Sequence, residues 1–199
     1  MPARKQSAPA FWRGAAPLVL ASASPRRVQL LRQVGAEFTI ADPGPDRAWP
    51  GSADARHGVR ALALDKAKRV AAAHPDSVVI GADTVVVVRG MRLGKPADAE
   101  EAQAMLRRLH GRTHEVWTGL ALVRGTEQRT AAELTRVRFS RMDDDEIAAY
   151  VQSGESLDKA GAYGIQGRAA AFVRGIEGDY FNVVGLPLDR LRRLLFEFA

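Results

Sequence analysis

The stretch Leu18-Val-Leu-Ala-Ser-Ala-Ser-Pro-Arg-Arg-Val-Gln-Leu-Leu-Arg-Gln-Val-Gly35 decides the fold of this 199-residue chain. It begins with a short apolar run that has the length of a buried strand, and apolar residues then recur at helical spacing. Ser24 and Pro25 suit the N-cap and the first position of a helix, and Gly35 suits its end. The stretch therefore predicts a strand, a tight turn and an amphipathic helix.

The start of this predicted helix carries groups that bind phosphate. Free backbone N–H groups are joined there by the hydroxyls of Ser22 and Ser24 and the guanidinium groups of Arg26 and Arg27. A helix N-terminus of this composition attracts anions. The alternative is a capped helix whose arginines lie in solvent, and we favour phosphate binding.

Composition limits the class of protein. A hydrophobic fraction of 46% and a charged fraction of 26% are typical of a globular chain that buries a sizeable core. The absence of cysteine excludes disulfides, thiolate nucleophiles and cysteine-ligated zinc, and it fits a reducing compartment, so we expect a cytoplasmic protein. No apolar run reaches the length of a membrane span, so no membrane partner is expected.

Charge favours small anionic ligands. The net charge is +6 and the isoelectric point is about 10.1, which suits nucleotides or nucleic acid. The basic residues are scattered among acidic ones and form no continuous stripe with interleaved aromatic residues. We therefore expect a small anionic ligand such as a nucleotide as partner and no nucleic acid.

The order of segments predicts the domain organisation. Residues 1–16 are rich in Ala, Pro and Arg and lack the apolar core of a secretory signal, so we interpret them as a disordered lead. Strand-like and helix-like segments alternate over residues 17–199, which predicts a single α/β domain. Near its end, residues 169–174 and 180–184 are predicted to be short strands that precede a C-terminal amphipathic helix.

Asp83 is the leading candidate for chemistry. The segment Gly81-Ala-Asp-Thr84 interrupts a long β-branched apolar run. An acidic side chain in such a run must be paired, bind a metal or face a cleft. Asp83 is therefore predicted to be a general base or a metal ligand. The alternative is a strand-end aspartate that binds neighbouring backbone N–H groups.

Lysines at two places in the sequence are further candidates for the site of Asp83. Lys95 lies between Gly94 and Pro96, on a rigid turn that can aim an ammonium group at phosphate. Lys66 and Lys68 lie two residues apart on a predicted helix, so only one of them can face a cleft. For each of these lysines the alternative is a solvated side chain.

A glycine-rich segment, residues 154–167, is predicted to follow a ligand closely. Glu155, Asp158 and Lys159 offer contacts to a metal, to phosphate or to each other, and the amide of Gln166 can read the edge of a base. The alternative is a surface loop held together by the pair Asp158 and Lys159.

The remaining residue types narrow the reaction. The four histidines have no convincing metal-ligand spacing and are interpreted as structural, and no nucleophile elbow or glycine-rich phosphate loop is present. A phosphate-binding helix start, a buried acid and aimed lysines instead predict attack by water on a phosphate ester or anhydride. Such chemistry usually needs Mg²⁺ or Mn²⁺.

Several segments, in order, resemble the Maf (septum-formation-inhibitor) family of nucleoside triphosphate pyrophosphatases over about residues 17–197. The segments that carry the resemblance are Leu20-Ala-Ser-Ala-Ser-Pro-Arg-Arg27, Ala82-Asp-Thr-Val85, Gly94-Lys-Pro96, His114-Glu-Val-Trp-Thr-Gly119, Asp158-Lys-Ala-Gly-Ala-Tyr-Gly-Ile-Gln-Gly167 and Gly185-Leu-Pro-Leu188. The resemblance implies an elongated mixed sheet with flanking helices, two lobes around a deep nucleotide-binding cleft (ITPase-like), and a homodimer.

The resemblance also implies an activity, the hydrolysis of a nucleoside triphosphate to the monophosphate and pyrophosphate with a divalent cation. Asp83 matches the proton acceptor that activates water. The residues that match the phosphate and metal region are Ser22, Arg26, Arg27, Lys66 and Lys95. Arg26, Thr84 and Gln166 match positions linked to the branch that acts on dTTP and UTP. The alternative within the family is 7-methyl-GTP.

One departure from the family pattern concerns the segment Gly44-Pro-Asp-Arg47, where the family usually has Asp-Glu. Arg47 replaces a glutamate that is thought to help hold the metal or water, so Asp46 or Glu155 would have to take its part. This departure motivates a second hypothesis, a catalytically weak, nucleotide-binding regulator of cell division.

Overall fold

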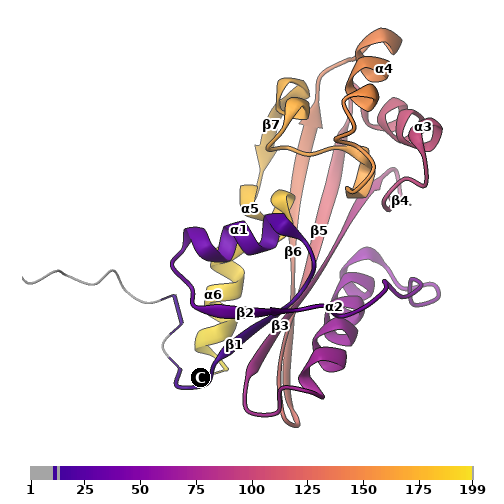
Figure 1. The fold of residues 1–199 in the computed structure, drawn as a ribbon. Coiled ribbons are helices and arrows are strands. Elements are labelled where there is room, and N and C mark those ends of the chain that lie inside the picture. Colours follow the sequence, from indigo (N-terminus) through magenta and orange to yellow (C-terminus); the bar gives the residue numbers. More distant parts are fainter. Residues whose placement is uncertain (1–10, 13, 199) are drawn as a thin grey trace, which may run out of the picture.

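The structure is a computed structural model that describes residues 11–12 and 14–198 (Figure 1). Its strands are β1 (Leu18–Ala21), β2 (Phe38–Ala41), β3 (Val78–Val88), β4 (Met91–Leu93), β5 (Thr113–Arg124), β6 (Glu127–Phe139) and β7 (Val173–Glu177). Its α-helices are α1 (Pro25–Gln33), α2 (Ala55–Ala71), α3 (Ala99–Leu109), α4 (Asp144–Gln152), α5 (Tyr180–Val184) and α6 (Leu188–Phe196). Two short 3₁₀ helices, η1 (Ala160–Ala162) and η2 (Arg168–Phe172), lie before β7.

The strands of the described chain form one mixed sheet of seven, in the order β2-β1-β3-β5-β6-β7, with β4 also paired to β3. β1 runs parallel to both of its neighbours, β2 and β3, whereas the remaining pairs are antiparallel. The chain leaves β1 in one direction through α1 and β2, then returns through α2 to β3 on the other side. This reversal creates a switch point between β1 and β3, where open α/β sheets bind their ligands. The predicted α/β class is confirmed.

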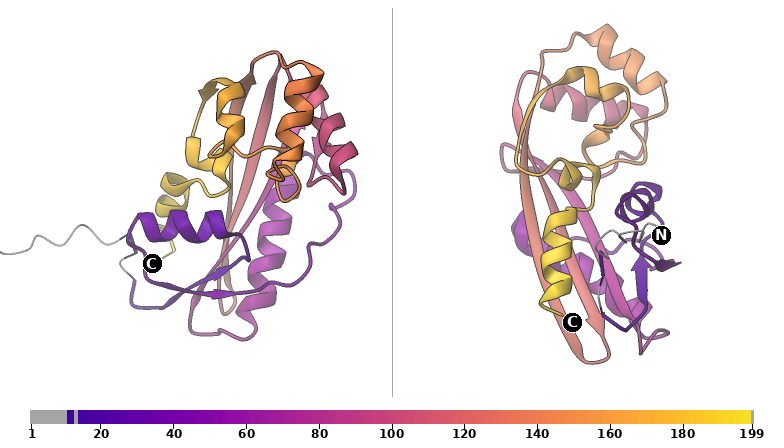
Figure 2. Two further views of the ribbon diagram at one scale, coloured as in Figure 1. Left: turned by 45° about the horizontal axis from the view of Figure 1, so that its top comes forward. Right: turned by 90° about the vertical axis from the view of Figure 1, so that its left-hand side faces the viewer.

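Long strands give the molecule its elongated shape. β3, β5 and β6 run along its length and carry two groups of elements (Figures 1 and 2). In Figure 1, β1, β2, α1, α2 and α6 lie at the lower end, and β4, α3, α4 and β7 lie at the upper end. The β5–β6 hairpin is closed by the turn between Arg124 and Glu127, where Gly125 has a φ of 55°.

Helix α2 packs unusually close to the sheet. A Cβ at Gly81 of β3 would lie 2.1 Å from the Ala63 carbonyl oxygen, and one at Gly119 of β5 would lie 2.1 Å from that of Val59. Only glycine fits at either position. This face forms a separate small core, whereas α1, α3, α4 and α6 contribute to the main core. The side chain of Asp83, two residues beyond Gly81, points to the α2 side of β3 and meets Lys66 of that helix.

Two predicted strands near the C-terminus were wrong. Residues 180–184 form helix α5, because the Asp179 carboxylate accepts a hydrogen bond from the Phe181 N–H at the start and Gly185, with a φ of 119°, ends it. These contacts outweigh the β-propensity of the segment. Most of residues 169–174 belongs to η2, and the strand begins only at Val173.

The predicted lead falls mainly on residues 1–10 and 13, which lie outside the described residues. Within the rest of it, Phe11 and Ala16 are buried in the main core, and Trp12 Nε1 donates a hydrogen bond to the Ala16 carbonyl, contacts the sequence did not predict. The boundary at residue 17 stays a prediction. No helix in the described part of the chain combines the length and apolarity that a membrane crossing requires.

Candidate active site

An interruption in the edge of β3 creates the candidate site. Residues Val78 to Gly81 pair with β1, and Val86 to Val88 pair with β4. Among the described residues, no strand pairs with 82–85 on this edge, although β5 pairs with them on the other. A cleft of about 860 Å³ opens beside this interruption, at the end of β1 and the start of α1. The chain thus places Asp83 and Thr84 where a ligand can reach the backbone of β3.

All the predicted site residues line this one cleft. They are Ser22, Arg26, Arg27, Asp46, Lys66, Asp83, Thr84, Lys95, Glu155 and Gln166. They come from the end of β1, from α1 and α2, from β3, and from the loops that follow β2, β4 and α4. The topology therefore brings together residues that are far apart in sequence. Which of them touch substrate stays a prediction.

Lys66 joins two carboxylates at the centre of the cleft. Its Nζ lies 2.6 Å from Oδ1 of Asp83 and 2.6 Å from Oδ1 of Asp46. The side chain of Lys66 is only 9% exposed and that of Asp83 only 15%, so both charges depend on this pairing. The prediction that one lysine of the pair faces a cleft is confirmed for Lys66, and Lys68 is exposed.

Asp46 is held as a carboxylate by two lysines. Burial by itself would raise the pKa of Asp46, but the hydrogen bond and charge of Lys66, with a contribution from Lys95, hold that pKa below its ordinary value. Lys95 Nζ lies 3.4 Å from Oδ2 of Asp46. The rigid turn at Gly94 to Pro96 thus aims its ammonium group at the cleft, as predicted.

The start of α1 is built differently from the prediction in one respect. Ser24 occupies the N-cap position, but its side chain makes no capping hydrogen bond. Ser22 provides a hydrogen bond at this helix start instead, since its Oγ accepts from the Ser24 N–H at 3.2 Å. Pro25 begins the helix as predicted, and residues 22–27 at this helix start line the cleft.

The side chain of Arg27 connects α1 to β3 and to the segment after α5. Its Nε donates to the Gly185 carbonyl at 2.8 Å, its Nη1 to the Ala82 carbonyl at 2.9 Å, and its Nη2 to Thr84 Oγ1 at 3.1 Å. Its Nη1 also lies 3.3 Å from Ser22 Oγ. Burial lowers the pKa of Arg27, against an opposing contribution from the charge of Asp83. Most of its N–H groups are thus engaged in joining α1 to β3 and to the segment after α5.

The glycine-rich loop reaches the cleft through Asp158. Arg26 Nη1 lies 2.8 Å from Asp158 Oδ2, and Lys159 Nζ lies 2.5 Å from Oδ1. Burial would raise the pKa of Asp158, but both cations hold it below its ordinary value. The pair of Asp158 and Lys159 therefore exists, and Arg26 joins it across the cleft. Glu155 Oε2 accepts a hydrogen bond from the Arg168 N–H and so holds the loop.

The whole described chain, apart from its first residues, matches one protein family. The family model with the description "Maf-like protein" matches residues 17–198.

The chain belongs to the Maf family.

Relatives of similar length carry one name. A protein of Symbiobacterium thermophilum, named "dTTP/UTP pyrophosphatase", is 54% identical over 182 residues, which cover 92% of this chain and 94% of the relative. A protein of Pelotomaculum thermopropionicum with the same name is 52% identical over 184 residues, covering 92% and 96%. A solved nucleoside-triphosphatase (dITP/XTP pyrophosphatase) of Mycobacterium abscessus shares 16% identity over 63% of this chain and 75% of its own, with a TM-score of 0.41.

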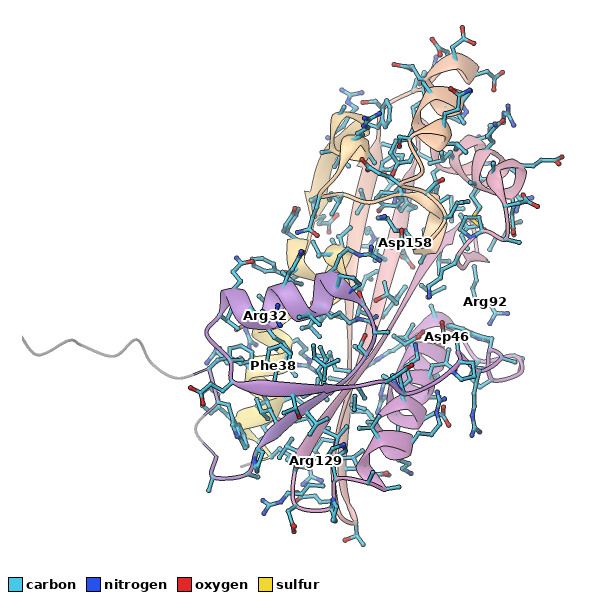
Figure 3. The ribbon with its side chains drawn as sticks, viewed as in Figure 1. Arg32, Phe38, Asp46, Arg92, Arg129 and Asp158 are labelled. Carbon is cyan, nitrogen blue, oxygen red and sulfur yellow. The ribbon has the colours of Figure 1, made fainter. Side chains whose placement is uncertain are left out.

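Several residues of this Maf cleft escaped prediction. Trp49 and Tyr163 line it. Arg92 of β4 stacks on Trp49 at 4.4 Å, and Tyr163 is bonded through its hydroxyl to Nε2 of the buried His114 at 2.8 Å. Figure 3 shows Arg92 on the upper side of this region and Asp46 on the lower side. No periodic pattern marks Trp49 in the sequence, but an aromatic residue in a Pro- and Gly-rich loop is itself a sign of a contact.

The departure at Arg47 has a structural consequence. Arg47 Nε lies 3.3 Å from Asp65 Oδ1, and Arg69 Nε lies 3.0 Å from Asp65 Oδ2. Arg69 Nη1 also donates to the Pro45 carbonyl at 3.1 Å. Arg47 thus helps to fasten the loop after β2 to α2, and neighbouring Asp46 is the residue of this segment that faces Lys66.

A metal would find two carboxylates here. Asp46 and Asp83 converge on one Nζ, and carboxylate oxygens are the ligands that Mg²⁺ and Mn²⁺ prefer. In the part of the chain that the structure describes, no group of three acidic, histidine or cysteine side chains comes together. Glu155 therefore does not join these two aspartates. Two carboxylates still fit Mg²⁺, which usually completes its shell with water and substrate phosphate.

Proposed function

We propose that this chain hydrolyses dTTP and UTP between the α- and β-phosphates, giving the nucleoside monophosphate and pyrophosphate. The pairing of Asp83 with Lys66 on the open edge of β3, inside a cleft rich in cations, carries the proposal. The names of the relatives in the Maf family support the same reaction and the same substrates. We place the nucleotide between the two groups of elements on the long strands.

Asp83 is the general base of the proposed reaction. Its carboxylate takes a proton from water as the water oxygen forms a bond to the α-phosphorus, and the bond to the bridging oxygen breaks so that pyrophosphate leaves. Lys66, at 2.6 Å, keeps the carboxylate in place and offsets negative charge on the phosphate. Water attacks the phosphorus directly, so the proposed reaction has no covalent enzyme intermediate.

Phosphate binding falls to the start of α1 and to the cations around it. The first turn of α1, Arg26 and Lys95 line the cleft, and the backbone N–H groups and cations there suit phosphate oxygens. Ser22 and Arg27 order this turn through their mutual contacts. Asp83 and Asp46 would hold a divalent cation. When bound, Mg²⁺ or Mn²⁺ offsets phosphate charge and polarises the reacting phosphoryl group.

Base selection is assigned to Thr84 and Gln166, which line the same cleft. The Gln166 amide is exposed and offers both a donor and an acceptor, as an imide-containing base requires. The rival substrate is 7-methyl-GTP, a larger purine nucleotide. The homodimer and the cytoplasmic location stay predictions.

The test is pyrophosphate release from dTTP, UTP, CTP, ATP and 7-methyl-GTP with Mg²⁺ or Mn²⁺. Asp83→Asn should lower release from dTTP and UTP by about 10²- to 10⁴-fold, because it removes the proton acceptor. Asp145→Asn is the matched control, since Asp145 lies exposed in the first turn of α4. Absence of release from dTTP and UTP by the unaltered chain would overturn the proposal, and release mainly from 7-methyl-GTP would favour the rival.

A second candidate is a nucleotide-binding regulator with weak catalysis. It is favoured by one observation, that Arg47 contacts Asp65 where the Maf pattern has a glutamate. This candidate predicts tight nucleotide binding without turnover. Efficient turnover by the unaltered chain would exclude it.

A further inference from the structure

A chain of buried hydroxyl groups leads from the cleft into the sheet. Thr84 Oγ1 lies 2.9 Å from Thr118 Oγ1, and Thr118 Oγ1 donates to the Asn182 carbonyl at 3.2 Å. Thr118 and Asn182 are fully buried, whereas Thr84 is half-buried on the cleft wall. Asn182 is fixed in turn, because its Nδ2 donates to the Val116 carbonyl and to Thr135 Oγ1.

The order of donors along this chain follows from counting protons. A threonine hydroxyl has one proton and two lone pairs. The Asn182 carbonyl can only accept, so the Thr118 proton satisfies that 3.2 Å contact. Both contacts of Thr118 are satisfied when Thr84 donates its own proton to Thr118. The opposite order would leave the contact between Thr118 and Asn182 without a proton.

One acceptor position of Thr84 therefore remains for a ligand. Its proton is committed to Thr118, and one of its lone pairs accepts from Arg27 Nη2 at 3.1 Å. The second lone pair has no partner among these contacts, and Thr84 lines the cleft. A ligand group that binds here must carry an N–H or O–H.

We propose that Thr118 is a positioning residue that holds Thr84 as a hydrogen-bond acceptor for the imide N–H of a uracil or thymine base. This inference rests on the proposed function, since it takes a pyrimidine nucleotide as the ligand. Uracil and thymine carry a proton on N3, whereas N3 of cytosine is an acceptor. With Thr84 locked as an acceptor, cytosine places two acceptors against each other, which leaves buried polar groups unpaired.

The test measures affinity and turnover separately for Thr118→Val. Affinity is measured with the α,β-methylene analogues of UTP and CTP, which cannot be cleaved at the proposed bond, and turnover as pyrophosphate release from UTP and CTP. Thr118→Val frees the Thr84 proton to turn toward the cleft. The preference for the uridine over the cytidine analogue should fall by about tenfold. Thr118→Ser keeps the hydroxyl and should restore the preference.

Thr118→Val should still fold, because the Asn182 carbonyl keeps the Gly185 N–H as a donor at 3.0 Å. Thr135→Val is the matched control: Thr135 is equally buried and bonded to Asn182 and Asp179, but it does not touch Thr84. It should lower stability without changing the preference. An unchanged preference in Thr118→Val, or an equal change in Thr135→Val, overturns the inference. A changed affinity ratio in a chain that releases no pyrophosphate overturns the proposed function alone.

Discussion

Lys66 Nζ lies 2.6 Å from Asp83 Oδ1, and this single contact links a helix to the open edge of a strand. The contact exists because the backbone of α2 packs directly on the backbone of the sheet, over Gly81 and Gly119. The position of the proposed base therefore depends on helix packing as much as on the cleft itself.

Replacement of Lys66 by methionine should separate charge from packing. The substitution leaves Asp46 and Asp83 facing each other without the cation between them, so burial dominates and the pKa of Asp46 rises. We expect kcat/KM for UTP to fall by about 10²-fold, because the cation offsets charge in the cleft. Lys68→Met, on the exposed side of the same helix, is the control. An equal loss in both variants would contradict the role of Lys66.

Alanine at Gly119 should push α2 away from the sheet. Its Cβ would lie 2.1 Å from the Val59 carbonyl oxygen, a distance that requires the helix backbone to move. We expect a loss of about 1–3 kcal/mol in the free energy of unfolding, measured with urea, together with reduced turnover as Lys66 leaves Asp83. Gly94→Ala is the stability control because its Cβ would meet open space. Unchanged stability in Gly119→Ala would refute this account of the close packing.

The sequence predicted the parts of the site that depend on local pattern. The helix start at Pro25, the buried strand around Asp83 and the turn at Lys95 each have a local cause, and the structure has all of them. The resemblance then added positions such as Thr84, whose importance no local pattern reveals.

What the sequence could not predict depends on contacts between distant segments. Arg27 bonds to Gly185, 158 positions away. Such bonds leave fewer of its N–H groups available to phosphate than the sequence predicted. Asn182 lies in a segment of β-like composition, yet it is part of helix α5 and its side chain bonds to Val116 and Thr135. Hydrophobic periodicity and secondary-structure propensity contain no information about either set of contacts.

Charge reversal at Arg47 should test how the loop after β2 is fastened. Arg47→Glu places a carboxylate beside Asp65, so loop attachment weakens, while Arg47→Ala should cost less than about 1 kcal/mol because the Arg47 side chain is exposed and Asp65 keeps its contact with Arg69. The loss in Arg47→Glu should exceed the loss in Arg47→Ala, because the glutamate adds repulsion from Asp65 to the loss of the ion pair, and equal losses would contradict this account. These stabilities are measured by urea denaturation.

Turnover of the Arg47 variants distinguishes the two candidate functions. The pyrophosphatase proposal expects Arg47→Ala to retain UTP hydrolysis to within about threefold, since the exposed Arg47 side chain contributes little through its pair with Asp65. The regulatory candidate expects hydrolysis to appear only when Arg47→Glu supplies a carboxylate.

His114 should make stability depend on pH in a defined window. Burial lowers its pKa from 6.5 to about 4, and its ring is held between Phe139 and Tyr163. Below pH 6.5 the unfolded chain binds a proton that the folded chain does not bind until about pH 4. The unfolded state thus holds more protons, so stability falls as pH falls through this window, by about 3 kcal/mol in total.

The measurement is urea denaturation at several pH values between about 4 and about 7, with His114→Gln as the test variant. Glutamine does not titrate and can still bond to the Tyr163 hydroxyl, so the slope over this window should shrink. Carboxyls with lowered pKa values, such as Asp46 and Asp158, lose their contributions at lower pH, whereas burial of Glu133 raises its pKa and opposes the His114 slope. His74→Gln is the control and should keep the full slope. If His114→Gln keeps it as well, the burial of a neutral His114 is not its source.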